Sequence, residues 1–117
     1  MCIRDSSFVA RAFAGDPKHL QEMMAAALQH TGGFALLDIL QPCPTYNKQN
    51  TFKWYRERVT KIEEGHDPHD RSAALELAFT WGDRIPIGII YKHDRPTFES
   101  HFDVLKKGTL VSQYEAG

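Results

Sequence analysis

The sequence predicts an α/β fold in which strands alternate with helices. Two short apolar segments, residues 8–13 and 34–40, have the length and composition of β-strands, and a helical repeat of apolar residues separates them. A strand, a helix and a strand joined by short links form one right-handed crossover unit of a parallel sheet. A third apolar segment, residues 85–91, indicates a further strand in the second half of the chain.

Composition and charge exclude several functional classes. The chain has 117 residues, which suits one small domain or a piece of a larger one. Its formal net charge of −1 argues against a surface for nucleic acid or an anionic membrane, because such surfaces need clustered lysine and arginine. No apolar run approaches the roughly 18 residues that suggest a membrane span. Two cysteines are too few for a disulfide scaffold, so we expect a cytoplasmic protein with reduced thiols.

Asp16 and Pro17 begin the predicted first helix. A carboxylate at the N-cap accepts hydrogen bonds from free backbone N–H groups, and proline is well tolerated at the first helical position. Glycine adopts the left-handed conformation without a side-chain clash, so Gly32 and Gly33 are expected to end the helix. The apolar residues that recur at helical spacing and form its predicted core stripe are Leu20, Met23, Met24, Ala27 and Leu28.

The second predicted strand leads directly to Cys43. Residues 34–40 are a nearly continuous apolar run, which suits a strand buried on both faces. Ligands of open α/β sheets gather beyond the carboxyl ends of the strands, where Cys43 follows. Pro42 and Pro44 restrict the backbone on both sides, so a thiol here has a fixed direction that suits a ligand or a nucleophile. A buried structural cysteine is the alternative interpretation.

Two more helices are expected in the second half of the chain. Asn50 or Thr51 is positioned to cap the first of them, and Asp70 follows a polar loop at residues 63–69 and is positioned to cap the second. The predicted packing residues of the first helix are Phe52, Tyr55, Val59 and Ile62. The second helix carries the apolar residues Ala74, Leu75, Leu77, Ala78 and Phe79. Pro86 favours a sheet edge or a strand start, and residues 96–117 are too weakly periodic to assign.

Two further groups of residues are candidates for binding. Residues 66–70 hold four potential metal ligands in five positions, but Pro68 and the spacing argue against a preformed site. A solvated turn that ends in the Asp70 cap is the favoured interpretation. Lys18 lies where a first helical turn can reach an anion, although a single glycine before an acidic cap is a poor anion cradle. A simply exposed lysine is the alternative.

Several segments together resemble the beta subunits of 2-oxoacid:ferredoxin oxidoreductases. The resemblance covers about residues 8–95. It implies that residues 7–44 are the C-terminal end of a thiamine-diphosphate-binding domain, a parallel sheet with flanking helices, and that residues 45–117 are the C-terminal extension of the beta subunit. The segments that carry it are FVAR at 8–11, GDPKHL at 15–20, GFALLDILQPCPTYN at 33–47, NTFKWYRER at 50–58, HDP at 66–68, WG at 81–82 and IPIGIIY at 85–91.

This resemblance implies a function and a role for two residues. The family converts a 2-oxoacid and coenzyme A to an acyl-CoA and carbon dioxide and reduces ferredoxin, using thiamine diphosphate, Mg²⁺ and a 4Fe-4S cluster. The fourth cysteine ligand of that cluster falls on Cys43. Lys18 matches a position that is typically lysine, which implies an anion-contacting or tuning role. The resemblance implies as partners an alpha subunit, with or without a gamma subunit, and ferredoxin.

Some features of the family do not occur in this sequence. The Gly-Asp-Gly to Asn motif that holds magnesium and diphosphate is absent, and so are the other three cluster cysteines. We therefore expect that the chain alone neither catalyses the reaction nor retains a cluster. Residues 1–6 match nothing in the family and lack the apolar core of a signal peptide, so we expect a non-native leader and exclude it, with Cys2, from functional reasoning.

Two questions stay open at the level of sequence. No side chain discriminates among 2-oxoacids, and only overall similarity favours 2-oxoglutarate or a broad specificity. The alternative function is a non-enzymatic α/β adaptor that holds a partner chain through the aromatic residues 52–55, for which core or subunit packing is the simpler interpretation. Paired cysteines and a Gly-Asp-Gly motif in the gene upstream of Phe8 would decide for the enzyme.

Overall fold

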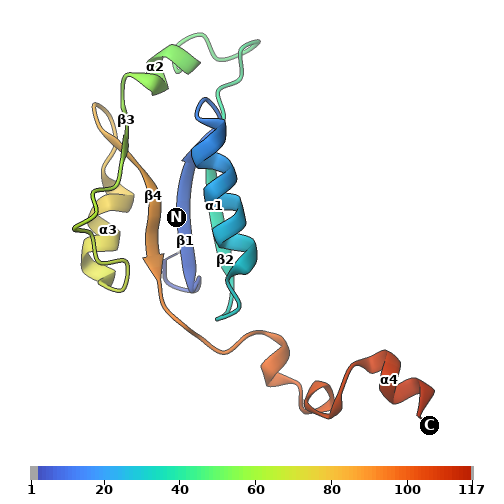
Figure 1. Cartoon of the computed structure of the whole chain (residues 1–117). Helices are drawn as coiled ribbons and strands as arrows, with labels where there is room; N and C mark the ends of the chain where they lie inside the picture. Colours follow the sequence, from blue (N-terminus) through green and yellow to red (C-terminus); the bar gives the residue numbers. More distant parts are fainter. Residues whose placement is uncertain (1–2, 117) are drawn as a thin grey trace.

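A computed structural model describes residues 3–116 as a four-stranded sheet with helices on both faces and a projecting C-terminal arm (Figure 1). The predicted α/β fold is confirmed. The elements in chain order are β1 (Phe8–Phe13), α1 (Pro17–Gln29), β2 (Ala35–Leu40), α2 (Phe52–Arg56), β3 (Val59–Lys61), α3 (Arg71–Phe79), β4 (Ile85–Lys92), the 3₁₀ turns η1 (Glu99–His101) and η2 (Asp103–Lys107), and α4 (Leu110–Glu115).

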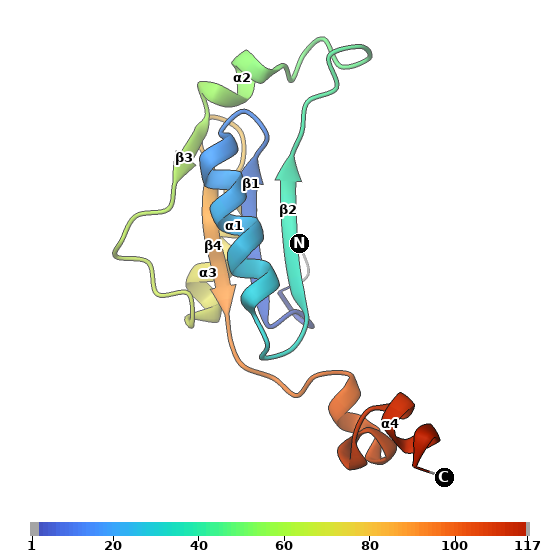
Figure 2. The same cartoon turned by 45° about the vertical axis from the view of Figure 1, so that its right-hand side comes forward.

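Strand β1 lies inside the sheet, whose order is β2-β1-β4-β3. It pairs in parallel with β2, as expected for a crossover unit, and antiparallel with β4, so the sheet as a whole is mixed. Helix α1 covers one face and α3 lies on the other (Figure 2). All six residues of β1 are buried as a result.

Strand β2 lies at the edge of the sheet. The prediction of a strand at this position is confirmed, but its burial on both faces is not, because only Leu40 is fully buried and Ile39 is exposed. Within residues 3–116 no strand pairs with its outer side. A continuous apolar run predicts that a strand prefers to be covered, and it does not identify the segment that covers it.

Helix α1 begins as predicted, but the face that it packs against the sheet differs from the predicted core stripe. The Asp16 carboxylate accepts a hydrogen bond from the His19 backbone N–H at 3.1 Å, and Pro17 is the first helical residue. The helix ends at Gln29, and Gly33 follows with a φ of +118°. The predicted core stripe is partly wrong, because Met24 and Leu28 are exposed while His19 is buried. A buried histidine does not register in a pattern of apolar residues.

The second predicted helix is much shorter than expected. Thr51 caps it, its Oγ1 accepting from the Trp54 backbone N–H at 3.3 Å, but the helix ends at Arg56. Val59 belongs to strand β3, which pairs with the start of β4. Val59 is β-branched and suits a half-buried position in a sheet. Its pairing with β4 therefore outweighs the helical pattern in this segment.

The predicted start of α3 and the predicted strand at β4 are confirmed, but two of the apolar residues of α3, Leu75 and Phe79, are exposed. Asp70 caps α3, its Oδ1 accepting from the Ser72 backbone N–H at 2.8 Å. Pro86 is the second residue of β4, where β3 alone pairs with the strand, so its missing donor interrupts no pairing with β1. The unassigned tail forms η1, η2 and α4, which extend away from the sheet (Figure 1).

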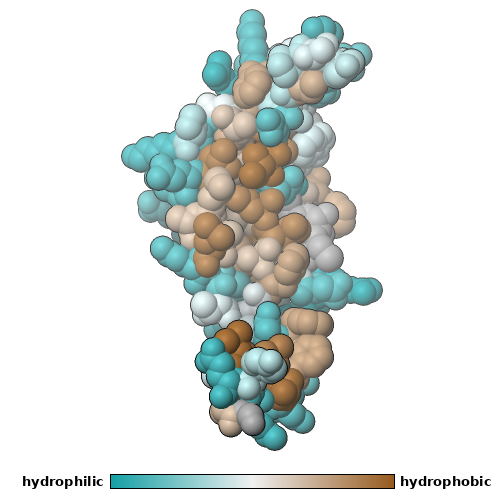
Figure 3. All heavy atoms as spheres, turned by 90° about the vertical axis from the view of Figure 1, so that its right-hand side faces the viewer, coloured by the Kyte–Doolittle hydropathy of each residue, from teal (hydrophilic) through white to brown (hydrophobic). Residues whose placement is uncertain are grey.

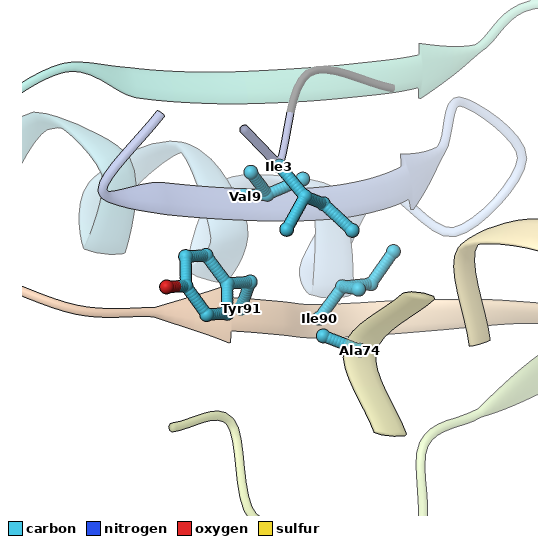
Figure 4. Close-up of a cluster of buried hydrophobic side chains, with 5 residues drawn as sticks. All are labelled: Ile3, Val9, Ala74, Ile90 and Tyr91. Atoms are coloured by element: carbon cyan, nitrogen blue, oxygen red, sulfur yellow. The ribbon is translucent and has the colours of Figure 1, made fainter. Parts of the chain in front are cut away.

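One hydrophobic cluster lies between the sheet and α3. Val9, Ala74, Ile90 and Tyr91 pack there together with Ile3 (Figure 4). Ile3 belongs to the expected non-native leader, and its side chain is buried. The non-native origin of that leader stays a prediction. Met1, Cys2 and Gly117 lie outside the described residues. A second cluster joins Phe13, Leu40, Ile85 and Ile87 at the other end of the sheet.

A buried ion pair crosses from β1 to β2. The Arg11 Nε atom lies 2.9 Å from Asp38 Oδ2, and the two side chains are 5% and 40% exposed, respectively. The Arg11 guanidinium also lies over the Trp81 ring, 5.4 Å from its centroid. Its buried Nη1 has no hydrogen-bond partner among the described residues. The buried Arg11 charge is therefore neutralised mainly by Asp38. The Asp38 carboxylate is partly exposed, so water also solvates its charge.

We predict an asymmetric response when this pair is broken. Asp38→Ala leaves a buried guanidinium without a counter-charge and is expected to lower the free energy of unfolding by about 3 kcal/mol. Arg11→Met leaves a carboxylate that water reaches, so its expected loss is only about 1 kcal/mol. Urea unfolding of both variants measures the two values. Equal losses would contradict the asymmetry.

Candidate functional site

The candidate site lies at the carboxyl ends of the parallel strands β1 and β2. The chain leaving β1 enters α1, which carries Lys18 in its first turn, and the chain leaving β2 enters the loop that carries Cys43. Parallel pairing brings the two exits to the same edge of the sheet, at the upper end in Figure 2. Ligands of open α/β sheets gather at such edges.

The Cys43 thiol is exposed and free at this edge. Backbone N–H groups of Tyr46 and Thr45 donate hydrogen bonds to its sulfur and lower the pKa of Cys43, with a smaller contribution from the Asn47 N–H. Each of these donors favours the thiolate over the thiol. Because the side chain is exposed, the alternative of a buried structural cysteine is wrong. The lowered pKa favours the thiolate, which is the form that binds metals or acts as a nucleophile.

Local hydrogen bonds hold the loop around Cys43 in shape. The Asn47 backbone N–H donates to the Cys43 carbonyl at 3.1 Å. The Asn47 side-chain oxygen accepts from the backbone N–H groups of Gln49 at 3.1 Å and Asn50 at 2.9 Å. Lys48 Nζ donates to the Pro44 carbonyl at 2.8 Å. The turn that aims three N–H groups at the sulfur is thus fixed by the loop itself.

Aromatic packing anchors this loop to the sheet. The Phe13 ring at the end of β1 contacts the rings of Phe52 and Tyr55 in α2, with centroids 5.9 and 5.7 Å apart. The Arg58 guanidinium lies 4.3 Å from the centroid of the Trp54 ring, and its Nη1 donates to the Trp54 carbonyl. These aromatic residues pack against the cluster of Phe13 and Leu40, so the packing interpretation of residues 52–55 is confirmed.

Lys18 is exposed in the first turn of α1. The residue that pairs with the Asp16 carboxylate is Lys61 of β3, whose Nζ lies 3.6 Å from Asp16 Oδ2. The hydrogen bond from the His19 backbone N–H is the main cause that lowers the pKa of Asp16, and Lys61 adds to it. Sequence reasoning missed Lys61, because nothing in the spacing brings β3 next to the start of α1.

His19 is a second residue that sequence reasoning missed. Its side chain is buried, Nδ1 has no hydrogen-bond partner among the described residues, and burial lowers the pKa of the imidazole, with Lys61 contributing. It lines a groove of about 330 Å³ together with Met23, Lys61 and His66. The imidazole is therefore neutral at neutral pH.

The histidine-rich segment forms the expected turn and cap. His66 Nε2 lies 2.8 Å from the Ile90 carbonyl oxygen, and Asp67 Oδ1 accepts from the His69 backbone N–H at 2.9 Å. Asp70 then begins α3. In the described part of the chain, no three side chains of histidine, cysteine, aspartate or glutamate converge as a metal site. None of its helices has the length and apolar character to cross a membrane.

Comparisons with known proteins bear directly on this site. The family model for the C-terminal part of the pyruvate ferredoxin oxidoreductase beta subunit matches residues 43–107. A 2-oxoacid:ferredoxin oxidoreductase subunit beta from a Sulfolobus species is 43% identical over 105 residues, covering 80% of this chain and 34% of that protein. The subunit beta of 2-oxoacid:ferredoxin oxidoreductase 2 from Aeropyrum pernix is 40% identical over 116 residues, covering 89% and 37%, respectively.

A solved structure matches most of the chain. The 2-oxoglutarate:ferredoxin oxidoreductase of Magnetococcus marinus, with 2-oxoglutarate, coenzyme A and succinyl-CoA bound, matches with a TM-score of 0.79 and 37% sequence identity. The match covers 94% of this chain and 40% of that chain. The present chain therefore spans well under half the length of the relatives it matches.

We predict that Cys43 alkylates at a lower pH than an ordinary cysteine. Because its pKa is lowered, the thiolate forms at a lower pH, and the midpoint of its reaction with iodoacetamide is expected below that of a cysteine in an unstructured peptide. Rates measured against pH in a Cys2→Ser background isolate this thiol.

The Asn47→Ala variant tests the cause. Loss of the Asn47 side-chain acceptor loosens the turn that aims the N–H groups at the sulfur, so the midpoint is expected to rise. Gln49→Ala keeps the backbone donor to Asn47 and serves as the control, with an unchanged midpoint. A midpoint at or above that of an ordinary cysteine in the unaltered loop would show that these donors do not act on the thiol.

Proposed function

The chain belongs to the family of 2-oxoacid:ferredoxin oxidoreductase beta subunits, and we propose that the complete subunit takes part in the oxidative decarboxylation of a 2-oxoacid. In this reaction a 2-oxoacid and coenzyme A give an acyl-CoA and carbon dioxide, and electrons reduce ferredoxin. The observation that carries the proposal for this chain is Cys43, an exposed thiol with a lowered pKa at the end of β2.

Cys43 fits the role of a 4Fe-4S ligand. The cluster is held by four cysteine thiolates, so this chain supplies one of them and the complete subunit must supply the rest. The N–H groups of Tyr46 and Thr45 favour the thiolate that binds iron, and hydrogen bonds to cluster sulfurs tune the reduction potential. The bound cluster supplies one-electron transfer. The residues of this chain hold the sulfur in place and stabilise its charge.

The residues of this chain fit a cluster ligand, but they do not fit a site for thiamine diphosphate and magnesium. The sequence has no Gly-Asp-Gly to Asn motif, and residues 3–116 bring no three potential metal ligands together. We therefore assign no step of the thiamine chemistry to this chain. Lys18 is exposed beside the strand ends, and we assign it a contact with an anion or a tuning role at this edge.

Substrate and partners belong to the same proposal. The substrate favoured is 2-oxoglutarate, which is supported by the 2-oxoglutarate and coenzyme A in the similar enzyme from Magnetococcus marinus. Relatives named subunit beta support assembly with an alpha subunit, with a gamma subunit in larger enzymes. Ferredoxin accepts the electrons, and the proposed location is the cytoplasm. The adaptor alternative loses its main support, because Phe52, Trp54 and Tyr55 pack against the core.

Replacing Cys43 tests the ligand role. In the full-length enzyme, Cys43→Ser is expected to lower ferredoxin reduction at least tenfold and to alter the electron paramagnetic resonance spectrum of the cluster. The thermal unfolding midpoint is expected to stay nearly unchanged, because the side chain is exposed. Thr45→Ala keeps the backbone donor and is the matched control. An unchanged cluster spectrum in Cys43→Ser would remove this residue from the ligand set.

The 117-residue chain gives an independent test. With one cluster cysteine it is expected to purify without stoichiometric iron and acid-labile sulfide and without 2-oxoacid oxidation. Colorimetric iron and sulfide analysis after anaerobic reconstitution measures this directly. Four irons and four sulfides per chain would overturn the expectation that the ligands are shared with the rest of the subunit.

A further inference from the structure

Basic residues are concentrated in one short segment of the chain. Residues 48–61 hold five lysines and arginines and one acidic residue, so this segment carries a net charge of +4 in a chain whose formal net charge is −1. The rest of the chain is therefore acidic overall, with a net charge of −5. The five basic residues are Lys48, Lys53, Arg56, Arg58 and Lys61.

Two of these five charges are balanced by carboxylates. Arg58 Nη1 lies 3.5 Å from Glu57 Oε2, and Lys61 Nζ lies 3.6 Å from Asp16 Oδ2. The Arg58 guanidinium is also held over the Trp54 ring, so it takes part in the packing of α2. These two residues therefore add little to the charge that the surface presents to a partner.

The other three charges are not balanced. Lys53 and Arg56 are exposed, and neither forms an ion pair with a residue that the structure describes. Lys48 is exposed as well, and its ammonium donates to a neutral group, the Pro44 carbonyl. We call Lys48, Lys53 and Arg56 together the basic surface.

Helix α2 directs two of these side chains away from the sheet. Phe52 and Tyr55 of the helix pack on Phe13 at the end of β1, so aromatic side chains occupy its inner side. Residues three apart lie on the same side of a helix. Lys53 and Arg56 are spaced in this way and are both exposed, so they project together from the outer side of α2.

The basic surface lies at the same edge of the sheet as Cys43. Lys48 belongs to the loop that carries Cys43, and this loop leads directly into α2 at the upper end of the molecule (Figures 1 and 2). Figure 3 shows mostly hydrophilic atoms at that end, above an apolar surface on the middle of the molecule. A protein that docks at the upper end therefore meets charge more than apolar surface.

The position of the basic surface indicates the kind of partner that it binds. In the proposed function, electrons leave through a cluster that Cys43 helps to hold. Electron transfer slows steeply as the gap between donor and acceptor widens, so an acceptor protein must dock close to this edge. Complementary charge steers such a partner to its site and fixes its orientation without a large apolar contact.

We propose that Lys48, Lys53 and Arg56 form the docking surface for an acidic electron-carrier protein, the ferredoxin of the proposed function. The carrier that fits this surface presents carboxylates around its own redox centre. The proposal rests on the proposed function, because it needs a redox centre beside Cys43. It adds to that function the place where the carrier binds and the charge that the carrier must have.

Charge reversal in the complete enzyme tests the basic surface, with 2-oxoglutarate and coenzyme A as substrates. The variant with Lys53→Glu and Arg56→Glu is expected to raise the KM for ferredoxin at least about tenfold at about 0.05 M salt, and less than about twofold at about 0.5 M salt, because salt screens exposed charges. Reduction of a zwitterionic viologen, which is small and has no net charge, is expected to stay unchanged. The variant with Lys53→Gln and Arg56→Gln gives a smaller rise in KM and replaces the charge reversal if that variant does not purify.

The matched control is Arg71→Glu, which reverses the charge of an exposed arginine at the opposite end of the sheet. The Lys92 backbone N–H donates to the Pro68 carbonyl at 2.8 Å, which places the start of α3 near that end. The KM for ferredoxin is expected to change less than about twofold in this control, because the exposed charge lies far from the docking partner.

Four outcomes overturn the proposal. An unchanged KM for ferredoxin in the double variant, with normal viologen reduction, shows that ferredoxin docks elsewhere and leaves the proposed function intact. Equal rises in the double variant and in Arg71→Glu show an effect of net charge and not of a docking surface. A parallel loss of viologen reduction shows that these residues act on the enzyme itself. An unaltered enzyme that reduces neither acceptor with a 2-oxoacid overturns the proposed function as well.

Discussion

The burial of β1 on every side is the constraint on which the rest of this structure depends. Strands flank both of its edges, α1 covers one of its faces, and all six of its residues are buried. A charged residue in that strand needs a partner inside the protein, and Arg11 finds Asp38 and the Trp81 ring. The parallel pairing of β1 with β2 then brings the chain that leads to Cys43 and the chain that leads to α1 out at the same edge of the sheet, which defines the site.

Features that depend on neighbours in the sequence were predictable. Of the features that depend on distant partners, the parallel pairing of β1 with β2 was expected from the crossover unit, and most others were not. Asp16, Thr51 and Asp70 cap their helices as expected, because each cap joins a side chain to an N–H group two or three residues away. The edge position of β2 and the end of α2 at Arg56 depend on strands far along the chain, which the local pattern does not encode.

The same distinction between local and distant contacts applies to the candidate site. The position of Cys43 at a strand end followed from the apolar run and the flanking prolines, and its assignment as a cluster ligand followed from the family resemblance. The N–H groups that lower its pKa come from a turn closed by the Asn47 side chain, and sequence alone does not show where such donors point. The burial of His19 and the pairing of Lys61 with Asp16 likewise arise from tertiary contacts.

The lowered pKa of the exposed Cys43 thiol also has a chemical consequence of its own. Peroxide attacks thiolates far faster than thiols and converts an accessible one first to a sulfenic acid and then to irreversible products. Cys43, which is exposed and has a lowered pKa, is therefore open to oxidative damage while its sulfur is not bound to another group. Such oxidation would compete directly with the iron binding proposed for this thiol.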